Sequence, residues 1–282
     1  MAKPISKIAA MTDLAHEIRH AVEAGKLLPA AAANILGLLG KSSSPLYPAA
    51  IAELASVGAW NELNDRFYKT LAFGTGGLRG RTIGKTVTVA ERGAPQPLGR
   101  PEFPCVGTNA MNFYNIGRAT QGLVAYLKGW WAQGFRPGLP KIVIAHDTRH
   151  FSREFAELAA RVAIENGCDA ALFEGPRSTP QLSFAVRHLH ASAGIVITAS
   201  HNPSHDNGYK VYFDEGAQVV EPQASGIIAQ VNALESDGYT PLPLAQHGQL
   251  QVLGRELDDA YMERLETLVL DRSVVDLSLI HI

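Results

Sequence analysis

Short apolar runs alternate with longer amphipathic stretches in the central part of the chain. The apolar runs predict buried strands: Lys141–Ala145, Ala170–Phe173 and Ile195–Ile197. The amphipathic stretches predict helices before and between them: Asn115–Trp131, Ser152–Ile164 and Thr179–Leu189. We expect Val211–Val220 to add strand material near one edge. Strands and helices in this order favour an α/β fold, with a mixed, mostly parallel sheet sandwiched by helices.

Residue types that favour helix ends predict where two of these helices begin and where one of them ends. Ser152 is expected to be the N-cap of its helix, and Gly167 the glycine that ends it. Thr179 is expected to be the N-cap of the next helix, with Pro180 at the first helical position. Each of these helices then follows one predicted strand and leads to the next.

Helical patterns also flank this core on both sides. Residues 1–60 predict Ala-rich helices that pack outside the main domain and carry no chemistry, and a further helical run covers Trp60–Phe73. Beyond Tyr239 we expect one helix, Glu256–Leu270, and no strand for it to pack on, so this tail should be mobile or packed non-natively. The predicted organisation is an N-terminal helical extension (1–60), a main α/β domain (61–237) and an incomplete second α/β domain (238–282).

Composition narrows the class of protein without naming a function. With 46% hydrophobic and 18% charged residues, the 282-residue chain has the balance of a well-packed globular protein. Its formal net charge of −2 gives no reason to expect a nucleic acid or an anionic membrane surface as partner. Two cysteines, Cys105 and Cys168, cannot form a disulfide framework and suit a cytoplasmic location. No stretch of the sequence predicts a transmembrane span, and the oligomeric state stays open.

A polar cluster follows the predicted strand Ile195–Ile197 and is the strongest candidate for chemistry. It reads Thr198-Ala199-Ser200-His201-Asn202-Pro203 and continues as Asp206-Asn207-Gly208-Tyr209-Lys210. Ligands of α/β sheets bind at the carboxyl ends of strands, which makes Ser200 a candidate nucleophile and His201 and Lys210 candidate donors or proton carriers. Gly208 permits a close or left-handed approach of the backbone. An ordinary polar turn has the same composition, so the residue types alone leave both interpretations open.

A glycine-rich stretch, Phe73–Arg81, is the second candidate. Its four glycines surround Arg79, which suggests a loop whose backbone approaches a ligand while the guanidinium holds a phosphate or a carboxylate. Arg79 stands where a dinucleotide-binding fingerprint needs its third glycine, and Gly80–Thr86 is one residue short of a P-loop. By spacing alone, a flexible glycine hairpin fits this stretch equally well.

The two candidate stretches resemble the α-D-phosphohexomutases, the family of phosphoglucomutases and phosphomannomutases. Thr198–Pro203 followed by Asp206–Lys210 closely resembles the phosphoserine loop of that family, and Phe73–Gly80 is similar to its first signature loop. Phe73–Gly80 and Tyr209–Tyr212 most resemble the branch that contains phosphoglucomutases and phosphopentomutases. The resemblance extends from about Asn61 to the end of the chain.

This resemblance implies an isomerase that works as an intramolecular phosphotransferase. It would interconvert sugar 1-phosphates and 6-phosphates, or pentose 1- and 5-phosphates, through a phosphoserine and a bisphosphorylated sugar. Which sugar phosphate is used stays open. Mg²⁺ is the implied cofactor, a sugar bisphosphate the implied activator and a small-molecule sugar phosphate the implied partner, with no nucleic acid and no membrane.

The resemblance also implies a role for each candidate residue. The implied catalytic residues are Ser200 as phosphoserine, Lys210 as general acid/base, His201 to orient the sugar hydroxyl or the phosphoryl group, and Arg79 to stabilise the transferring charge. The implied phosphate-binding and loop-shaping residues are Arg149, Asn202, Asn207 and Gly208. Through its phosphate, Ser200 is the one implied metal ligand of this chain, because the family's Asp-rich metal loop is absent from the sequence.

Members of the family have four domains, and this sequence resembles the first and the opening of the second. We therefore expect an N-terminal fragment of such an enzyme, inactive alone, whose residues 277–282 are not native. The alternative function is that of a catalytically incompetent fragment without the metal-binding and sugar-binding domains. A serine hydrolase is disfavoured because residues 198–202 do not form a Gly-x-Ser-x-Gly elbow.

Overall fold

The computed structural model describes residues 7–42, 44–74 and 76–271. The segment expected to be non-native, residues 277–282, lies outside the described residues. Buried hydrophobic side chains gather in three clusters: one on each face of a central sheet, and one among the N-terminal helices.

A six-stranded sheet in the order β1-β5-β4-β2-β3-β6 forms the centre of the described residues. Its strands are β1 (Gly77–Arg81), β2 (Lys141–His146), β3 (Asp169–Phe173), β4 (Ala193–Ile197), β5 (Asp206–Phe213) and β6 (Leu250–Leu253). β2 pairs in parallel with β3 and β4, and β6 pairs in parallel with β3, whereas β5 runs antiparallel to both β4 and β1. The predicted α/β fold with a mixed, mostly parallel sheet is confirmed.

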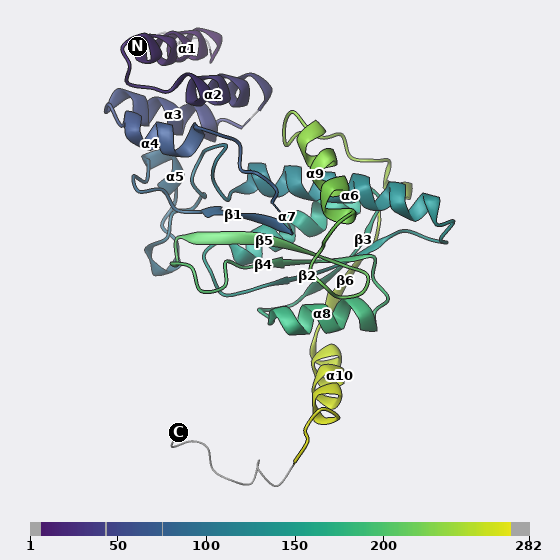
Figure 1. Cartoon of the computed structure of the whole chain (residues 1–282). Coiled ribbons are helices and arrows are strands. Elements are labelled where there is room, and N and C mark those ends of the chain that lie inside the picture. Colours follow the sequence, from purple (N-terminus) through teal and green to yellow (C-terminus); the bar gives the residue numbers. More distant parts are fainter. Residues whose placement is uncertain (1–6, 43, 75, 272–282) are drawn as a thin grey trace, which may run out of the picture.

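Helices cover both faces of this sheet (Figure 1). One face carries α6 (Phe113–Gln133), α7 (Ser152–Glu165) and α9 (Gln223–Ala233), and the other carries α8 (Thr179–His188). Along β2, Ile142 and Ile144 pack in the cluster with α6 and α7, while Val143 and Ala145 pack in the cluster with α8. Successive side chains of a strand point to opposite faces, so a strand covered on both faces is apolar at every position. This arrangement explains the uninterrupted apolar runs of the sequence.

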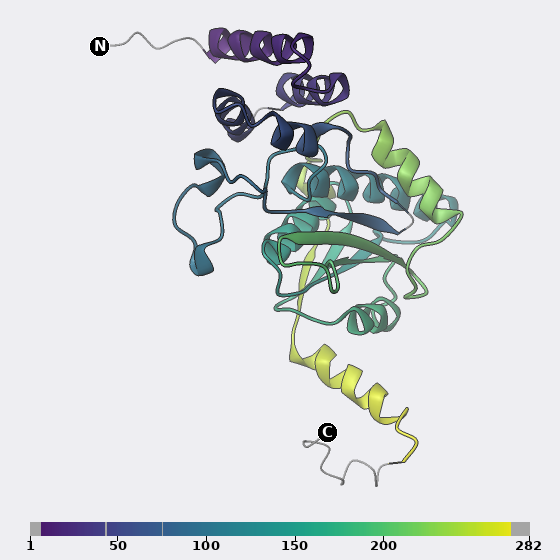
Figure 2. The same cartoon turned by 60° about the vertical axis from the view of Figure 1, so that its left-hand side comes forward.

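Within the described residues, four helices precede β1: α1 (Lys7–Glu23), α2 (Pro29–Lys41), α3 (Leu46–Ser56) and α4 (Trp60–Phe67). Figure 2 shows α1 and α2 stacked outside α3 and α4. Their hydrophobic cluster also includes Val106 and Tyr114, so the predicted helical extension packs directly on the main domain. The helical run predicted to reach Phe73 ends at Phe67 instead. Beyond it, Leu71 and Phe73 pack in the core of the main domain, and the Leu71 backbone N–H donates to the Thr108 carbonyl at 2.8 Å.

The long connection between β1 and α6 is anchored by a buried ion cluster. This connection contains α5 (Val89–Arg92) and the 3₁₀ turn η1 (Pro97–Gly99), which stand out from the domain in Figure 2. Arg66 of α4, only 2% exposed, pairs with Glu62 at 2.8 Å and with Glu91 of α5 at 2.5 Å. Removing one partner of a buried ion pair leaves an uncompensated charge, so this cluster ties α5 firmly to α4.

The predicted N-cap of α7 is wrong by one residue. Phe151, with a φ of 65°, precedes the helix, and Ser152 is its first helical residue. The Ser152 hydroxyl donates instead to Asp147 at 2.6 Å, which draws it away from the capping position. The predicted stop is confirmed, because Gly167 follows the C-cap with a φ of 82°, in the left-handed region that glycine favours.

The predicted N-cap of α8, Thr179, also lies one residue after the observed N-cap. Ser178 has the extended backbone of an N-cap, and its hydroxyl accepts a hydrogen bond from the Gln181 backbone N–H at 3.3 Å. Thr179 and Pro180 are therefore the first and second helical residues. A serine and a threonine are both good N-caps, and the sequence offered no means of choosing between neighbours.

The second half of the glycine-rich stretch, from Gly77 on, forms a strand and not a loop. Gly77–Arg81 is β1, and β5 lies between it and β4, starting at Asp206, earlier than predicted. In the register of this antiparallel pair, Gly77 lies opposite Lys210. A Cβ on Gly77 would lie 1.8 Å from the Tyr209 carbonyl oxygen, so only glycine lets the two strands approach. Glycine is depleted in strands, which is why the sequence favoured a loop here.

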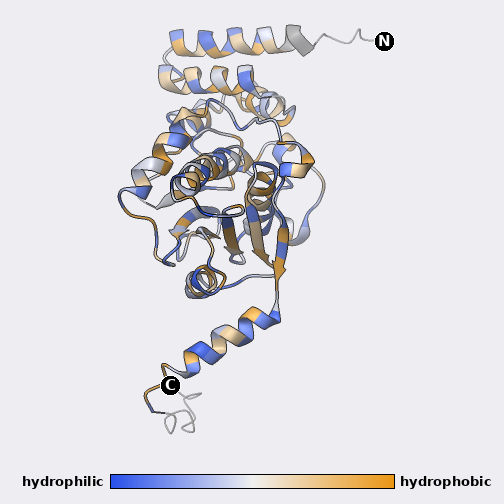
Figure 3. Cartoon of the chain, turned by 90° about the vertical axis from the view of Figure 1, so that its right-hand side faces the viewer, coloured by the Kyte–Doolittle hydropathy of each residue, from blue (hydrophilic) through white to orange (hydrophobic). Residues whose placement is uncertain are grey.

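The segment beyond Tyr239 contains a strand, contrary to the expectation. β6 pairs in parallel with β3 at the edge of the sheet, after the 3₁₀ turn η2 (Leu244–Gln246). Next, α10 (Arg255–Glu266) projects from the body of the domain (Figure 3), and Arg177 holds its Asp258 through hydrogen bonds of 2.7 and 2.6 Å. The strand was missed because four residues with Gln251 among them are too few to show a period. The division of the chain between residues 237 and 238 stays a prediction.

The helices within the described ranges were also tested as membrane spans. None of them combines the length and the apolar character needed to cross a bilayer.

Candidate active site around Ser200

Ser200 lies in a tight turn directly after β4. Its φ of 55° is in the left-handed region, which residues other than glycine seldom adopt. Its backbone N–H donates to the Thr198 hydroxyl at 3.0 Å, and the residue is exposed. The turn therefore presents the Ser200 hydroxyl at the carboxyl edge of the sheet, where ligands of α/β folds bind.

Lys210 reaches the same hydroxyl from β5. It lies opposite Val196 in the ladder between β4 and β5, and its Nζ donates a 2.8 Å hydrogen bond to Ser200 Oγ. Partial burial lowers the pKa of Lys210, the nearby positive charge of Arg79 lowers it further, and Asp147 opposes the shift. A lowered pKa brings the amine closer to the range in which it can both donate and accept a proton.

Arg79 approaches the serine turn from β1. Among the described residues, its exposed guanidinium has one acceptor, Asn202 Oδ1 at 3.4 Å, so most of its N–H groups are available to a ligand. Gly208 lies opposite Arg79 in the register of β1 and β5. A Cβ on Gly208 would lie 2.5 Å from the Thr198 carbonyl oxygen. Gly208 thus allows β5 to fit against the start of the turn.

Arg149 holds residues 200–206, the serine loop, through their backbone carbonyl groups. Its Nη1 and Nη2 donate to four carbonyl oxygens at 2.5–3.2 Å, those of Ser200, Asn202, Pro203 and Asp206. Its Nε lies 3.3 Å from Asp147 Oδ2. Each nitrogen of the guanidinium therefore has an acceptor within the protein. In this arrangement Arg149 positions the loop, and its implied role in binding a ligand phosphate stays a prediction.

Asp147 and Asn207 extend this network beneath the loop. Asp147 Oδ1 accepts from the Arg149 backbone N–H at 2.9 Å and from the Ser152 hydroxyl at 2.6 Å. Asn207 is fully buried and donates to Ser152 Oγ at 2.9 Å and to the His150 carbonyl at 3.0 Å. Asn207 therefore shapes the loop from within the protein. The sequence reasoning missed Asp147, although its place directly after a predicted strand was an available signal.

Asn202 and His201 differ in how firmly they are held. Asn202 Nδ2 donates to Asp206 Oδ2 at 3.0 Å, and its Oδ1 faces Arg79. His201 is exposed, and its imidazole makes no hydrogen bond or ion pair with another described residue. The chain therefore fixes the orientation of the Asn202 amide but not that of the His201 ring.

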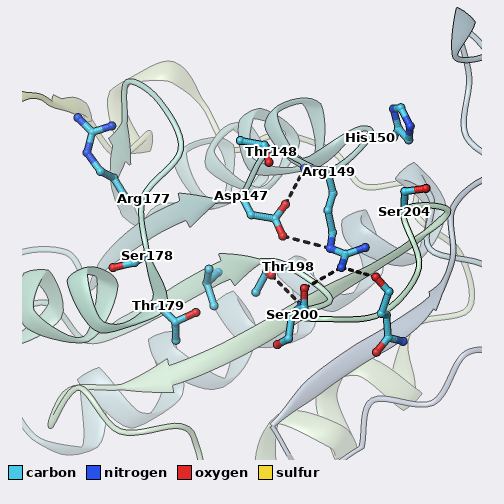
Figure 4. A pocket seen from close by; sticks show the side chains of 12 residues that line it. Asp147, Thr148, Arg149, His150, Arg177, Ser178, Thr179, Thr198, Ser200 and Ser204 are labelled. Atoms are coloured by element: carbon cyan, nitrogen blue, oxygen red, sulfur yellow. Dashed lines mark hydrogen bonds and ion pairs between the residues drawn. The ribbon is translucent and has the colours of Figure 1, made fainter. Parts of the chain in front are cut away.

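A pocket of about 570 Å³ opens beside Ser200 (Figure 4). Segments that follow three different parallel strands line it: Asp147 and His150 after β2, Arg177 and Thr179 after β3, and Ser200 and Ser204 after β4. Figure 4 shows Arg177 and Thr179 on one side and His150 and Ser204 on the other. The sequence reasoning missed the contribution of Arg177 and Thr179, which only the parallel pairing of β2 with β3 and β4 brings to this edge.

Comparison with known proteins agrees with this geometry. Residues 105–237 match the family model described as phosphoglucomutase/phosphomannomutase, alpha/beta/alpha domain I. A phosphoglucomutase of Staphylococcus saprophyticus is 31% identical over 216 residues, covering 74% of this chain and 33% of that protein. A phosphopentomutase of Homo sapiens is 38% identical over 184 residues, covering 63% of this chain and 26% of that protein. The chain thus spans about a quarter to a third of the length of these curated relatives.

A solved structure supports the same relationship. It is that of a Thermus thermophilus protein assigned as a phosphomannomutase, with a TM-score of 0.51 and 29% identity over 71% of this chain and 36% of the other. The fold and the serine turn therefore define an α/β/α domain of the sugar phosphate mutase class. Residues 105–237 belong to the phosphoglucomutase/phosphomannomutase family, as its domain I. The resemblance to this family that the sequence showed is confirmed.

Replacing Arg149 tests whether it holds the serine loop. A lysine at this position has three donors on one nitrogen and cannot reach four carbonyl oxygens and Asp147 together. We expect Arg149→Lys to lower the free energy of unfolding by about 2–3 kcal/mol, the worth of hydrogen bonds to a charged group. Amide hydrogens of residues 200–206 should exchange faster with solvent, as followed by hydrogen exchange and mass spectrometry. The matched control is Arg153→Lys, because the Arg153 side chain is 61% exposed. Unchanged exchange at residues 200–206 in Arg149→Lys would show that the loop is held by other contacts.

Proposed function

We propose that this chain carries the phosphoserine domain of an isomerase that interconverts sugar 1-phosphates and 6-phosphates, or pentose 1- and 5-phosphates. The observation that carries the proposal is the 2.8 Å hydrogen bond from Lys210 Nζ to Ser200 Oγ at the carboxyl edge of the sheet. Membership of a family of sugar phosphate mutases supports the substrate class. The proposal covers glucose, mannose and pentose phosphates alike.

Ser200 and Lys210 would share the proton that phosphoryl transfer requires. When a sugar hydroxyl attacks the phosphorus of phospho-Ser200, the bond between phosphorus and Ser200 Oγ breaks. The sugar oxygen releases its proton to the water at this exposed turn in the forward step and regains one from water in the return step. Lys210 then protonates Oγ along the hydrogen bond already formed, and takes the proton back when Ser200 attacks the sugar bisphosphate. The lowered pKa of Lys210 favours both directions of this exchange.

The remaining site residues would stabilise charge and fix geometry. Arg79 would contact the transferring phosphoryl group with N–H groups that the protein leaves available, since guanidinium groups match phosphate oxygens well. His201 would orient the attacking hydroxyl, because it is exposed next to Ser200. Arg149 would act through the loop that it holds.

Among the residues around Ser200, the structure offers a magnesium ion one ligand, the phosphate of a phosphorylated Ser200. Within the described residues, no group of three or more His, Cys, Asp and Glu side chains is arranged to hold a metal. The nearby carboxylate of Asp147 is already engaged by Arg149 and Ser152. A phosphorylated Ser200 would add one hard oxygen, the type of ligand that Mg²⁺ prefers. A bound Mg²⁺ would neutralise charge on the transferring phosphoryl group.

The second candidate function is that of a chain which does not turn over alone. Two observations favour it. The chain spans about a third of the S. saprophyticus relative, and its described residues contain no group of three or more His, Cys, Asp and Glu side chains that could hold a metal. Phosphoryl transfer depends mainly on electrostatic stabilisation, so a site without its metal should lose most of its rate. In that case, the residues around Ser200 act only within a longer protein.

Phosphorylation of Ser200 is the direct test of the proposed intermediate. In the full-length protein incubated with glucose 1,6-bisphosphate, we expect peptide mass spectrometry to find one phosphate on Ser200, the hydroxyl that Lys210 contacts. The matched control is Ser204→Ala, which removes a hydroxyl lining the same pocket and should keep the phosphate. A phosphate found at Ser204 or Ser152 and not at Ser200 would rule out the assignment.

Replacing Lys210 tests the proton transfer. Lys210→Met keeps the length of the side chain and removes the donor, so in the full-length protein kcat should fall by about 10²–10⁴ while KM changes little. Steady-state kinetics with glucose 1-phosphate measures both constants. The same replacement at Lys128, an exposed residue of α6 that contacts Asn166, is the matched control. If kcat survives in Lys210→Met, this amine has no part in the reaction.

An activity assay on the 282-residue chain separates the two candidate functions. With Mg²⁺ and glucose 1,6-bisphosphate present, we expect no conversion of glucose 1-phosphate to glucose 6-phosphate in a coupled dehydrogenase assay. The physical reason is the missing metal site among the described residues. Robust turnover that Ser200→Ala abolishes would show that the chain is a competent enzyme and would exclude the second candidate.

A further inference from the structure

A second pocket lies at the opposite edge of the sheet from Ser200 and takes no part in the proposed phosphoryl transfer. It encloses about 400 Å³ and is lined by Trp130, Trp131, Arg136, Arg187, His190 and Asp214, among others. These residues lie at the end of α6, at the end of α8 and in the turn after β5. β5 connects the two sites: its eight residues, at about 3.3 Å each, place them roughly 25 Å apart.

A stacked arginine forms one wall of this second pocket. The guanidinium carbon of Arg136 lies 3.5 Å from the centroid of the Trp130 ring and 5.4 Å from that of Trp131. Trp130 in turn packs edge-on against Phe213, with centroids 4.8 Å apart. A guanidinium stacked on a ring keeps the N–H groups in its own plane available to acceptors. The Arg136 side chain donates no hydrogen bond to another described residue, so these groups can meet a ligand.

Unpaired charges of both signs line the other walls. The Arg187 side chain makes a single hydrogen bond, from Nε to the Ser183 carbonyl at 3.4 Å, which leaves Nη1 and Nη2 without an acceptor in the described part of the chain. The Asp214 carboxylate has no hydrogen bond or ion pair with any described residue. Its turn is nevertheless fixed, because Ser183 Oγ donates to the Gly216 carbonyl at 2.5 Å. Two guanidinium groups and a carboxylate thus share one pocket without pairing with one another.

We propose that this pocket binds a phosphate monoester carried on a hydroxylated body, the chemistry of a sugar phosphate, at a site separate from Ser200. Arg136 and Arg187 would hold the phosphate, whose oxygens match guanidinium N–H groups. Asp214 would accept a hydrogen bond from a hydroxyl of the body, and Trp131 would cover its apolar face. A free phosphate can use only the first set of contacts, and a neutral sugar only the second.

The tryptophans of the pocket provide the signal for a binding test. The chain has three tryptophans, two of which, Trp130 and Trp131, line this pocket. In a Trp60→Phe variant of the 282-residue chain, indole fluorescence reports on this pocket alone. The probes are glucose 6-phosphate, inorganic phosphate and glucose, titrated separately. Circular dichroism of each variant checks that it folds.

The expected Kd differs between the probes and between the variants. Glucose 6-phosphate should change the fluorescence saturably and bind more tightly than inorganic phosphate or glucose. Arg187→Ala should raise its Kd about tenfold, the effect of losing a charge-assisted hydrogen bond. Asp214→Asn should raise the Kd of glucose 6-phosphate several-fold without weakening inorganic phosphate. Arg153→Ala, which removes an exposed arginine at the other edge of the sheet, should change neither value.

Three outcomes would overturn the proposal. The first is the absence of a saturable change with millimolar glucose 6-phosphate, and the second is an unchanged Kd in Arg187→Ala. The third is loss of the fluorescence change in Ser200→Ala, which would assign the signal to the site around Ser200. Because this test needs no turnover, it can fail or succeed independently of the proposed isomerase activity.

Discussion

The grip of one guanidinium on four backbone carbonyl groups underlies the geometry of the serine loop. Arg149 follows β2 in the chain, yet it binds carbonyl oxygens from Ser200 to Asp206, across the gap between β4 and β5. A serine in the left-handed region is strained by about 1–3 kcal/mol and persists only when its surroundings determine it. The contacts of Arg149, together with the buried links among Asp147, Ser152 and Asn207, supply that determination.

The placement of β5 explains why the candidate chemistry gathers at this edge. A parallel sheet brings strand ends together on one side, and an antiparallel strand begins where its neighbours end. β5 therefore starts beside the serine loop, which allows Lys210, its fifth residue, to meet the hydroxyl of Ser200. The close approach of β1, β5 and the turn depends on positions without a Cβ, Gly77 and Gly208. Gly77 and Gly208, one in each candidate stretch, thus serve strand packing, and the Arg79 side chain between Gly77 and Gly80 faces the site.

Local patterns and the resemblance to a family predicted the fold class and the approach of Lys210 to Ser200. The continuous apolar runs at β2 and β4 predicted the fold class correctly, because both faces of these strands are covered. What the sequence could not show depends on contacts between distant segments. Arg149 binds backbone carbonyl groups. Because every residue has such a group, no residue pattern in the sequence could predict which residues Arg149 binds. β1 was missed because glycine obscures strand propensity. The place of Arg177 in the pocket was missed because only the parallel pairing of β2 with β3 and β4 brings it to that edge.

The backbone angle of Ser200 restricts which residues evolution or an engineer can place there. Threonine carries the same hydroxyl, but its branched Cβ is a genuine outlier at a φ of 55°. A change from serine to threonine at this position would therefore require a rebuilt turn and not a single substitution. Aspartate and asparagine, in contrast, tolerate the left-handed region. The residue that resembles a phosphoserine in charge is thus also one that this backbone accepts, which makes Ser200→Asp a conformationally faithful mimic of the proposed phosphorylated state.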